Sequence, residues 1–193
     1  MSQRDYLTIV SGLPRSGTSM MMRMIEQGGM PVLVDHLRTA DDDNPNGYYE
    51  FEPVKKTKQD PSWVPGGVGK VVKMVHLLLL DLPLDFQYRV VFMRRHLDEV
   101  VKSQNVMLER HGDTTDDLPR ERLIDIYRLQ IKKVADYVDQ HSDQFEMIEI
   151  DYNEMLRNPR PQAEMVSDLV DGLDLEAMIE VVDPKLYRNR VTS

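Results

Sequence analysis

Short apolar runs alternate with longer amphipathic segments along this chain, and the alternation predicts strands followed by helices. Apolar runs at 7–10, 70–75, 89–93 and 147–150 predict the strands. The third run is unbroken from residue 90 to residue 93, as expected of a parallel strand buried on both faces. The pattern predicts an α/β fold in which helices cover both faces of a parallel sheet, with ligands at the carboxyl ends of its strands.

The segments between these runs carry helical patterns. Residues 18–27 form a helix that ends at Gly28-Gly29, and a helix over 97–110 follows the third strand. Residues 118–140 place apolar side chains on one helical stripe, at Leu123, Ile126, Tyr127, Ile131, Val134 and Val138. Two short helices, separated by Asn158-Pro159, follow the last strand.

Three segments between the predicted elements are rich in turn-forming residues. Residues 12–17 form a loop between the first strand and the first helix. Residues 35–49 are acidic and polar, so we expect an exposed loop there. Residues 61–69 contain glycines, prolines and the only tryptophan, and form either a lid or a plain connector.

Length and composition favour a single domain spanning residues 1–193, because 41% of the residues are hydrophobic. The longest apolar run, around 77–80, is much shorter than the roughly 20 residues of a membrane-spanning helix. Residues 1–6 contain Arg4 and Asp5 rather than an apolar secretory signal, and the chain has no cysteine. We therefore expect a cytoplasmic protein without thiolate chemistry.

The formal net charge of -9 argues against a general nucleic-acid surface, which needs clustered lysine and arginine. Any site for an anion must therefore be local. Two tight basic clusters oppose the overall charge, namely Arg94 with Arg95 and Arg188 with Arg190.

The loop after the first strand has the composition of a phosphate-binding loop. It reads Gly12-Leu13-Pro14-Arg15-Ser16-Gly17-Thr18-Ser19 and lies between a predicted strand and a predicted helix. Backbone amides at such a turn, the positive end of the helix and the hydroxyls can all donate to a phosphate. Thr18 stands where a Walker loop has lysine, and this disfavours an ordinary ATPase or GTPase. The alternative is a strand-to-helix turn that binds no ligand.

The segment Pro14-Arg15-Ser16-Gly17-Thr18-Ser19 resembles the loop of the sulfotransferase superfamily, whose pattern is Pro-(Lys/Arg)-Ser-Gly-Thr-(Thr/Ser). The arginine form is similar to tyrosylprotein and several bacterial members. The resemblance implies a three-layer fold like that of P-loop NTPases, with a central parallel sheet of four to five strands flanked by helices. It also implies that Pro14, Arg15, Ser16, Gly17, Thr18 and Ser19 bind the 5'-phosphosulfate of 3'-phosphoadenosine 5'-phosphosulfate.

The resemblance extends to a second anion site. Family members have an arginine at the end of a strand and a serine eight positions later, which together hold the 3'-phosphate; Arg95 and Ser103 occupy these places. Arg94 is a further possible partner. The alternative is a solvated arginine pair that binds Asp98 or Glu99. Arg188 and Arg190 are placed like the basic carboxyl-terminal loop of the family, without its Arg-Lys-Gly sequence, and a frayed basic tail is the other interpretation.

Sulfuryl transfer needs a base for the acceptor proton and donors for charge on the leaving oxygen, a role that Arg15 can fill. Two residues are candidate bases. His76 follows Lys73-Met74-Val75 and resembles the histidine of a Lys-Thr-His-Leu segment, with one extra residue between lysine and histidine. Glu50 follows the acidic loop, in a part of the chain from which some members use a glutamate, and Glu52 is a near alternative. Lys73 is a candidate for contact with the sulfonate.

Together these features predict a transferase that moves a sulfonate from the phosphosulfate donor to a hydroxyl or amine, leaving adenosine 3',5'-bisphosphate and requiring no metal. The acceptor is a small molecule or a hydroxyl of a glycan or peptide. One rival is a kinase on the same scaffold, which would need magnesium and carboxylates near the strand ends. Another is a nucleotide-binding protein that has lost the chemistry. The oligomeric state is open.

Overall fold

A parallel four-stranded sheet forms the centre of the computed structural model, which describes residues 4–35, 47–111 and 118–182. The strands are β1 (Tyr6–Gly12), β2 (Val71–Val75), β3 (Gln87–Arg94) and β4 (Phe145–Asp151). Their order across the sheet is β2-β1-β3-β4, and every neighbouring pair is parallel. The predicted α/β class and parallel sheet are confirmed.

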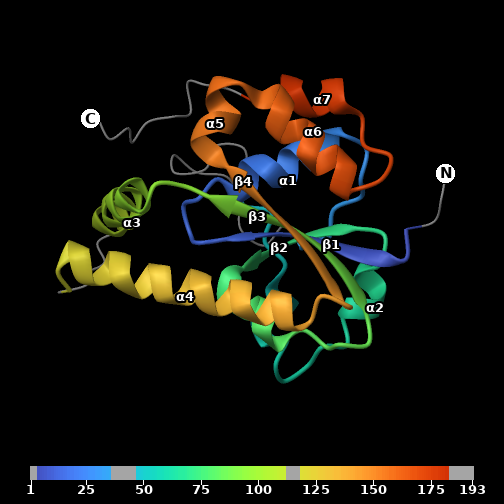
Figure 1. Cartoon of the computed structure of the whole chain (residues 1–193), viewed down its shortest axis with the longest axis horizontal. Coiled ribbons are helices and arrows are strands. Elements are labelled where there is room, and N and C mark those ends of the chain that lie inside the picture. Colours follow the sequence, from blue (N-terminus) through green and yellow to red (C-terminus); the bar gives the residue numbers. More distant parts are fainter. Residues whose placement is uncertain (1–3, 36–46, 112–117, 183–193) are drawn as a thin grey trace.

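Helices cover both faces of this sheet, so the fold has three layers (Figure 1). One face packs against α1 (Thr18–Gln27), α5 (Tyr152–Arg157), α6 (Pro159–Leu169) and α7 (Leu175–Glu180). The other face packs against α4 (Arg120–Gln140), the short helix α2 (Val64–Gly67) and the 3-10 helix η2 (His76–Asp81). The remaining helix, α3 (Leu97–His111), lies beyond the carboxyl ends of the strands.

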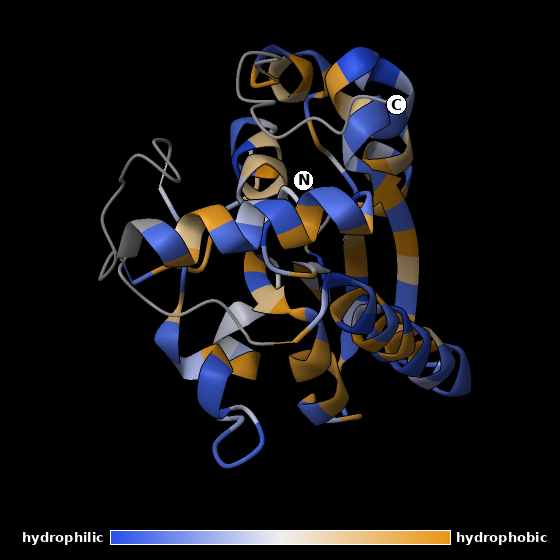
Figure 2. Ribbon diagram, turned by 90° about the vertical axis from the view of Figure 1, so that its left-hand side faces the viewer, coloured by the Kyte–Doolittle hydropathy of each residue, from blue (hydrophilic) through white to orange (hydrophobic). Residues whose placement is uncertain are grey.

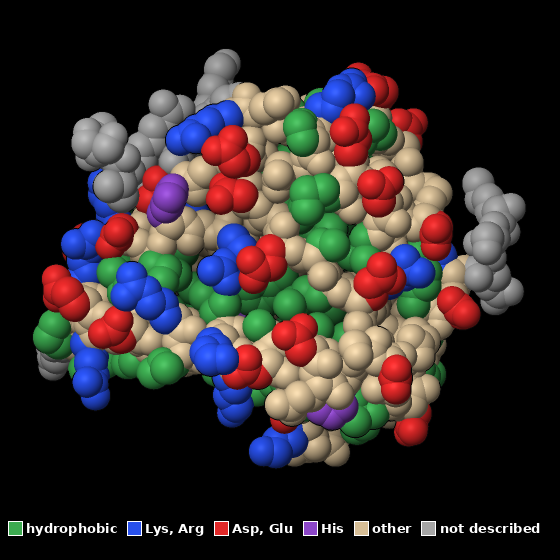
Figure 3. All heavy atoms as spheres, viewed as in Figure 1, with side chains coloured by type: hydrophobic (Ala, Val, Ile, Leu, Met, Phe, Trp, Pro, Cys, Tyr) green, Lys and Arg blue, Asp and Glu red, His purple; other side chains and the backbone are tan. Residues whose placement is uncertain are grey.

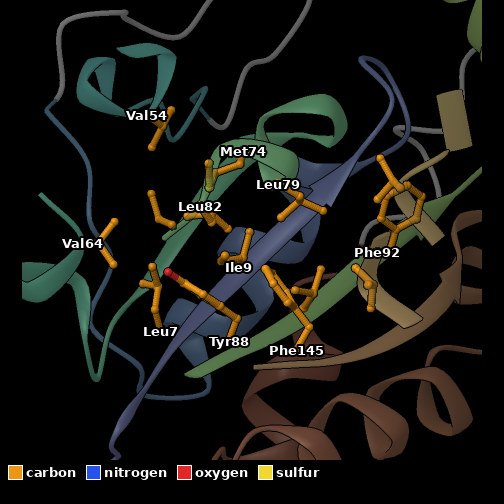
Figure 4. Close-up of a cluster of buried hydrophobic side chains, with 14 of the residues drawn as sticks. Leu7, Ile9, Val54, Val64, Met74, Leu79, Leu82, Tyr88, Phe92 and Phe145 are labelled. Atoms are coloured by element: carbon orange, nitrogen blue, oxygen red, sulfur yellow. The ribbon is translucent and has the colours of Figure 1, made fainter. Parts of the chain in front are cut away.

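Strand side chains alternate between two hydrophobic cores, as the pleat requires. Leu7 and Ile9 of β1 point into the core under α4, whereas Val10 points into the core under α1. Tyr88 stacks on Phe145 in the α4 core, with ring centroids 4.8 Å apart (Figure 4). The strands are accordingly mostly hydrophobic in Figure 2, while the helices carry hydrophilic and hydrophobic residues in turn. This two-sided burial explains the unbroken apolar run at residues 90–93 of β3.

Local structure was missed where helices are short. Residues 61–69 include α2, and a 3-10 helix, η1 (Glu52–Lys56), precedes it. The α2 region is anchored because Trp63 is buried and donates a hydrogen bond from Nε1 to Thr57 Oγ1 at 3.1 Å. Helix α7 also went unpredicted. Elements of four to six residues contain too few turns for a 3.6-residue periodicity to appear.

The surface mixes charges of both signs. Figure 3 shows acidic and basic side chains interspersed on the face it presents, with apolar side chains between them. Within the described ranges, no helix is long and apolar enough to cross a membrane.

Candidate functional site

The loop after β1 turns sharply, and its first glycine permits the turn. Gly12 has φ +149°, and a Cβ there would lie 2.6 Å from Ser16 Oγ and 2.7 Å from the Met93 carbonyl oxygen. Ser16 is buried and its Oγ donates to the Leu13 carbonyl at 2.7 Å. The chain therefore folds back on itself directly at the end of β1, at the carboxyl edge of the sheet.

Two further loop residues have left-handed backbone. Arg15 has φ +67°, which is unusual for a residue with a side chain, and Gly17 has φ +95° and caps α1. No side chain caps the amino terminus of α1. The amides at the start of a helix have no acceptor within the helix itself, and helix ends of this kind can bind phosphate.

Arg15 and Ser103 meet, although 88 positions separate them in the sequence. Arg15 Nε donates to Ser103 Oγ at 3.0 Å, and Ser103 is buried on α3. The first residue was predicted for the 5' end of the nucleotide and the second for its 3'-phosphate. The fold thus brings the two expected anion sites into one cluster at the edge of the sheet.

Arg95 joins the same cluster through the backbone. Its Nη1 donates to the Arg15 carbonyl at 3.0 Å, and its Nε donates to Glu99 Oε2 at 2.9 Å. The Arg95 side chain is only 7% exposed and that of Glu99 only 1%. The pairing with Glu99 was weighed as a solvated alternative, but this pair is buried. Arg94 instead pairs with Glu149 of β4 at 3.1 Å, on the surface.

Sequence reasoning named Glu99 as a possible partner of the arginine pair but did not identify Tyr152 and Asn153 as its neighbours. The Arg95 guanidinium lies over the Tyr152 ring, 4.7 Å from its centroid, and Asn153 Nδ2 lies 3.2 Å from Glu99 Oε2. Tyr152 also contacts the loop, because a Cβ on Gly17 would lie 2.3 Å from Tyr152 Cδ2. Burial raises the pKa of Tyr152, so its phenol is neutral. The local signal for this group was the spacing of Arg95 and Glu99, four residues apart across the start of α3.

Lys73 and Ser19 lie together at the far end of the loop. Lys73 Nζ donates to the Tyr48 carbonyl and lies 3.5 Å from Ser19 Oγ, which itself donates to that carbonyl at 3.4 Å. Lys73 therefore faces α1 rather than open solvent. Tyr48, although it ends the loop expected to be exposed, is buried.

The two candidate glutamates lie just after Tyr48. Glu50 is 22% exposed, and its Oε2 lies 3.6 Å from Lys55 Nζ. Glu52 pairs with the same lysine, and the Glu52 amide donates to Asp35 Oδ2 at 2.6 Å. Both carboxylates thus interact with Lys55. Glu50 is the closer in sequence to Tyr48, whose carbonyl accepts from Ser19.

His76 lies at the end of β2, on the opposite face of the sheet from Lys73. It is 3% exposed, and its Nε2 lies 3.0 Å from Gln130 Oε1 of α4. Burial lowers the pKa of His76, opposed by the Gln130 hydrogen bond and by the nearby Gly12 carbonyl. The imidazole is therefore neutral near pH 7. Its Nδ1 is buried without a well-formed hydrogen bond to any described residue.

Arg188 and Arg190 lie outside the described residues, as does most of the acidic loop. Within those residues, no three His, Cys, Asp or Glu side chains gather as metal ligands.

The contact between Gly17 and Tyr152 predicts a strong effect of a single methyl group. Gly17→Ala should lower the free energy of unfolding by about 2–4 kcal/mol, because it combines a left-handed φ with a clash in a packed site. The measurement is urea unfolding. Gly66→Ala is the matched control, since a Cβ there meets no atom within 4 Å, and its stability should be unchanged or higher. Equal stability of the two variants would contradict the described loop packing.

The lowered pKa of His76 predicts a pH dependence of stability. The unfolded chain takes up a proton near pH 6.5, above the pKa of the folded state, so this contribution to stability is present above about pH 6.5 and lost as the pH falls through the folded-state pKa. His76→Gln, which cannot be protonated there, should lose less stability between about pH 7.5 and pH 5 than the wild type. Urea unfolding at both pH values measures this, and identical losses would contradict it.

No protein-family model matches this sequence, and no curated protein is similar to it at the sequence level. Solved structures do resemble the fold. A sulfotransferase domain from the curacin biosynthetic pathway aligns with a TM-score of 0.55 at 13% identity, covering 94% of this chain and 79% of that domain.

A second match is the sulfotransferase domain of the Synechococcus PCC 7002 olefin synthase. Its TM-score is 0.59 at 14% identity, covering 96% of this chain and 87% of that domain. Identities this low establish the fold rather than the reaction. The order and direction of the strands, the loop after β1 and these two alignments together show that the chain has a sulfotransferase-type fold.

Proposed function

We propose that this protein is a sulfotransferase that moves a sulfonate from 3'-phosphoadenosine 5'-phosphosulfate to a hydroxyl or amine acceptor. The observation that carries the proposal is the hydrogen bond between Arg15 and Ser103, with Arg95 on the Arg15 carbonyl. A nucleotide with anionic groups at both its 5' and 3' positions needs donors for each. The sulfotransferase-type fold supports the same choice, with all of residues 1–193 acting as one domain.

The loop provides the donors for the 5' end in this proposal. Left-handed backbone at Arg15 and Gly17 turns the chain between β1 and α1, and the start of α1 adds the positive end of its dipole. Pro14, Ser16, Thr18 and Ser19 complete the segment. Pro14 has no N–H to donate, and the Ser16 amide and hydroxyl are both bonded to the Leu13 carbonyl. The donors to the anion in this proposal are therefore Arg15, the hydroxyls of Thr18 and Ser19 and the amides at the start of α1, within an otherwise acidic protein.

Ser103 and Arg95 provide the donors for the 3'-phosphate. Ser103 Oγ lies at the Arg15 side chain, so a phosphate there would be met by the hydroxyl and by a guanidinium. Arg95 is held rigidly by Glu99 and lies within one hydrogen bond of the loop backbone. Arg188 and Arg190 are proposed as further contacts from the carboxyl-terminal segment.

The bound donor would supply an activated sulfuryl group with a phosphate leaving group. The bond that breaks joins sulfur to the oxygen that bridges sulfur and phosphorus. Arg15 and the loop amides stabilise the negative charge that grows on this oxygen. Lys73, beside Ser19, is placed to contact the sulfonate. The acceptor oxygen or nitrogen forms the new bond to sulfur in line, and its proton passes to a base, without a covalent enzyme intermediate and without a metal.

His76 and Glu50 remain the two candidate bases in this proposal. His76 is neutral near pH 7 and can therefore accept a proton, and its Nε2 is oriented by Gln130. Glu50 is more accessible and is partly neutralised by Lys55. His76 is 3% exposed and Glu50 22%, so an acceptor could reach Glu50 more readily.

Titration calorimetry tests the donor. Wild-type protein should bind adenosine 3',5'-bisphosphate without magnesium and more tightly than magnesium-ATP. Ser103→Ala should weaken bisphosphate binding by about tenfold, since one hydrogen bond to a charged group is lost. Adenosine 5'-phosphosulfate lacks the 3'-phosphate and is the matched control ligand, whose affinity should not change. Preference for magnesium-ATP would instead favour a kinase.

Turnover measurements test the base. With the phosphosulfate donor and a panel of simple phenols, alcohols and amines, either His76→Gln or Glu50→Gln should lower kcat by about a hundred- to ten-thousandfold, because a general base is lost. Bisphosphate affinity should stay unchanged in that variant. Glu52→Gln is the neighbouring control for Glu50. If all three variants keep wild-type turnover, none of these residues is the base; if the wild type binds without turnover, the protein is a binder only.

A further inference from the structure

Glu99 is a buried carboxylate beside the loop, and the proposed reaction gives it no role. It belongs to α3, is 1% exposed, and accepts from Arg95 Nε at 2.9 Å. Asn153 Nδ2 of α5 lies 3.2 and 3.4 Å from its two oxygens. Burying a carboxylate is costly unless it is paired and hydrogen-bonded, and this one is both. We call Arg95, Glu99, Tyr152 and Asn153 the Glu99 cluster.

The Glu99 cluster contacts the loop at two residues, Arg15 and Gly17. Both have left-handed backbone. Arg95 Nη1 donates to the carbonyl of Arg15, which has φ +67°. The Tyr152 ring packs directly against Gly17, which has φ +95°. Arg95 also lies over the Tyr152 ring, so the two contacts reinforce each other. Glycine adopts left-handed backbone readily, but at Arg15, which has a side chain, this conformation persists only where its surroundings hold it.

We propose that Glu99 is a positioning residue that presets the anion-binding loop. Its carboxylate accepts hydrogen bonds from Arg95 and from Asn153, and so fixes both. Tyr152 is the chain neighbour of Asn153. Arg95 and Tyr152 then hold the two left-handed loop residues in their conformations before a nucleotide binds. Glu99 touches no ligand in this scheme and acts only through Arg95 and Asn153. The consequence for nucleotide affinity rests on the proposed function, whereas the consequence for the loop does not.

The placement of the charge distinguishes this role from plain stabilisation of the fold. A buried ion pair is a weak source of stability compared with packed apolar side chains. Here it stands between α3, α5 and the loop, where apolar residues could fill space but could not orient a guanidinium towards a carbonyl. Preset donors bind an anion without the cost of ordering them on binding.

A charge swap tests the positioning role. Glu99→Gln removes the charge and sets an amide against the Asn153 amide, whereas Asn153→Asp sets two carboxylates together. Each single variant should weaken binding of adenosine 3',5'-bisphosphate by about tenfold or more. The double variant Glu99→Gln with Asn153→Asp keeps one carboxylate and one amide in the cluster, and it should recover most of the affinity. Calorimetry on the full chain measures all three.

Amide hydrogen exchange of residues 13–19 in the nucleotide-free protein provides a readout that needs no ligand. The Ser16 amide, bonded to the Leu13 carbonyl at 3.2 Å, should exchange faster in Glu99→Gln and return towards the wild-type rate in the double variant. Val138→Ala is the matched control. It removes buried volume in α4 near the start of β4, at the opposite edge of the sheet from the loop, so it should lower stability without loosening the loop.

The outcomes separate the two ideas. Wild-type affinity and loop exchange in Glu99→Gln would overturn the positioning role while leaving the sulfotransferase proposal intact. A double variant that folds but restores neither property would also overturn it, even if a single variant does not fold. The positioning role would also be overturned if Val138→Ala, at the same loss of stability as Glu99→Gln, accelerated amide exchange in residues 13–19 equally. Failure of the wild type to bind the bisphosphate, with faster loop exchange in Glu99→Gln, would instead refute the proposed function and support the positioning role.

Discussion

The left-handed backbone between β1 and α1 is the constraint on which the rest of the site depends. Without it the chain could not reverse from the end of β1 into α1 within so few residues. Gly12 and Gly17 adopt the necessary conformations because they lack a Cβ, but Arg15 does not have this freedom. Its conformation needs support from elsewhere in the fold, and the described contact is the Arg95 guanidinium on its carbonyl.

That dependence links distant parts of the chain. Arg95 lies between β3 and α3, Ser103 belongs to α3 and Tyr152 to α5, and all three reach a loop near the amino terminus. Parallel strands make this possible, because every strand ends at the same edge of the sheet and each following segment starts there. The two hydrophobic cores hold the edge rigid, so the polar contacts can be short and buried. A polar cluster of this kind specifies one arrangement more strictly than apolar packing does.

The sequence was sufficient for the strands, the long helices and the loop, because each has a local pattern. Continuous apolar runs marked the buried strands, and glycine, arginine and hydroxyl residues marked the turn. The prediction that Arg95 and Ser103 belong to one site came from the resemblance to a known family. What the sequence could not supply was which groups pair once the chain is folded. Asn153 and Gln130 are ordinary polar residues in the sequence, and their contacts with Glu99 and His76 each span 54 positions. Nor could it show that the Arg95–Glu99 pair is buried, since four-residue charge spacing is common on solvated helices.

The interval between Lys73 and His76 has a geometric effect of its own. Neighbouring side chains of a strand project to opposite sides, so a separation of two residues would keep a lysine and a histidine together, whereas three places them apart. Lys73 accordingly faces α1, and His76 faces α4. One added residue at the end of β2 thus moves the histidine to the opposite face of the sheet. A molecule that contacts both residues must extend across the carboxyl end of the sheet, so that Lys73 contacts it from one face and His76 from the other.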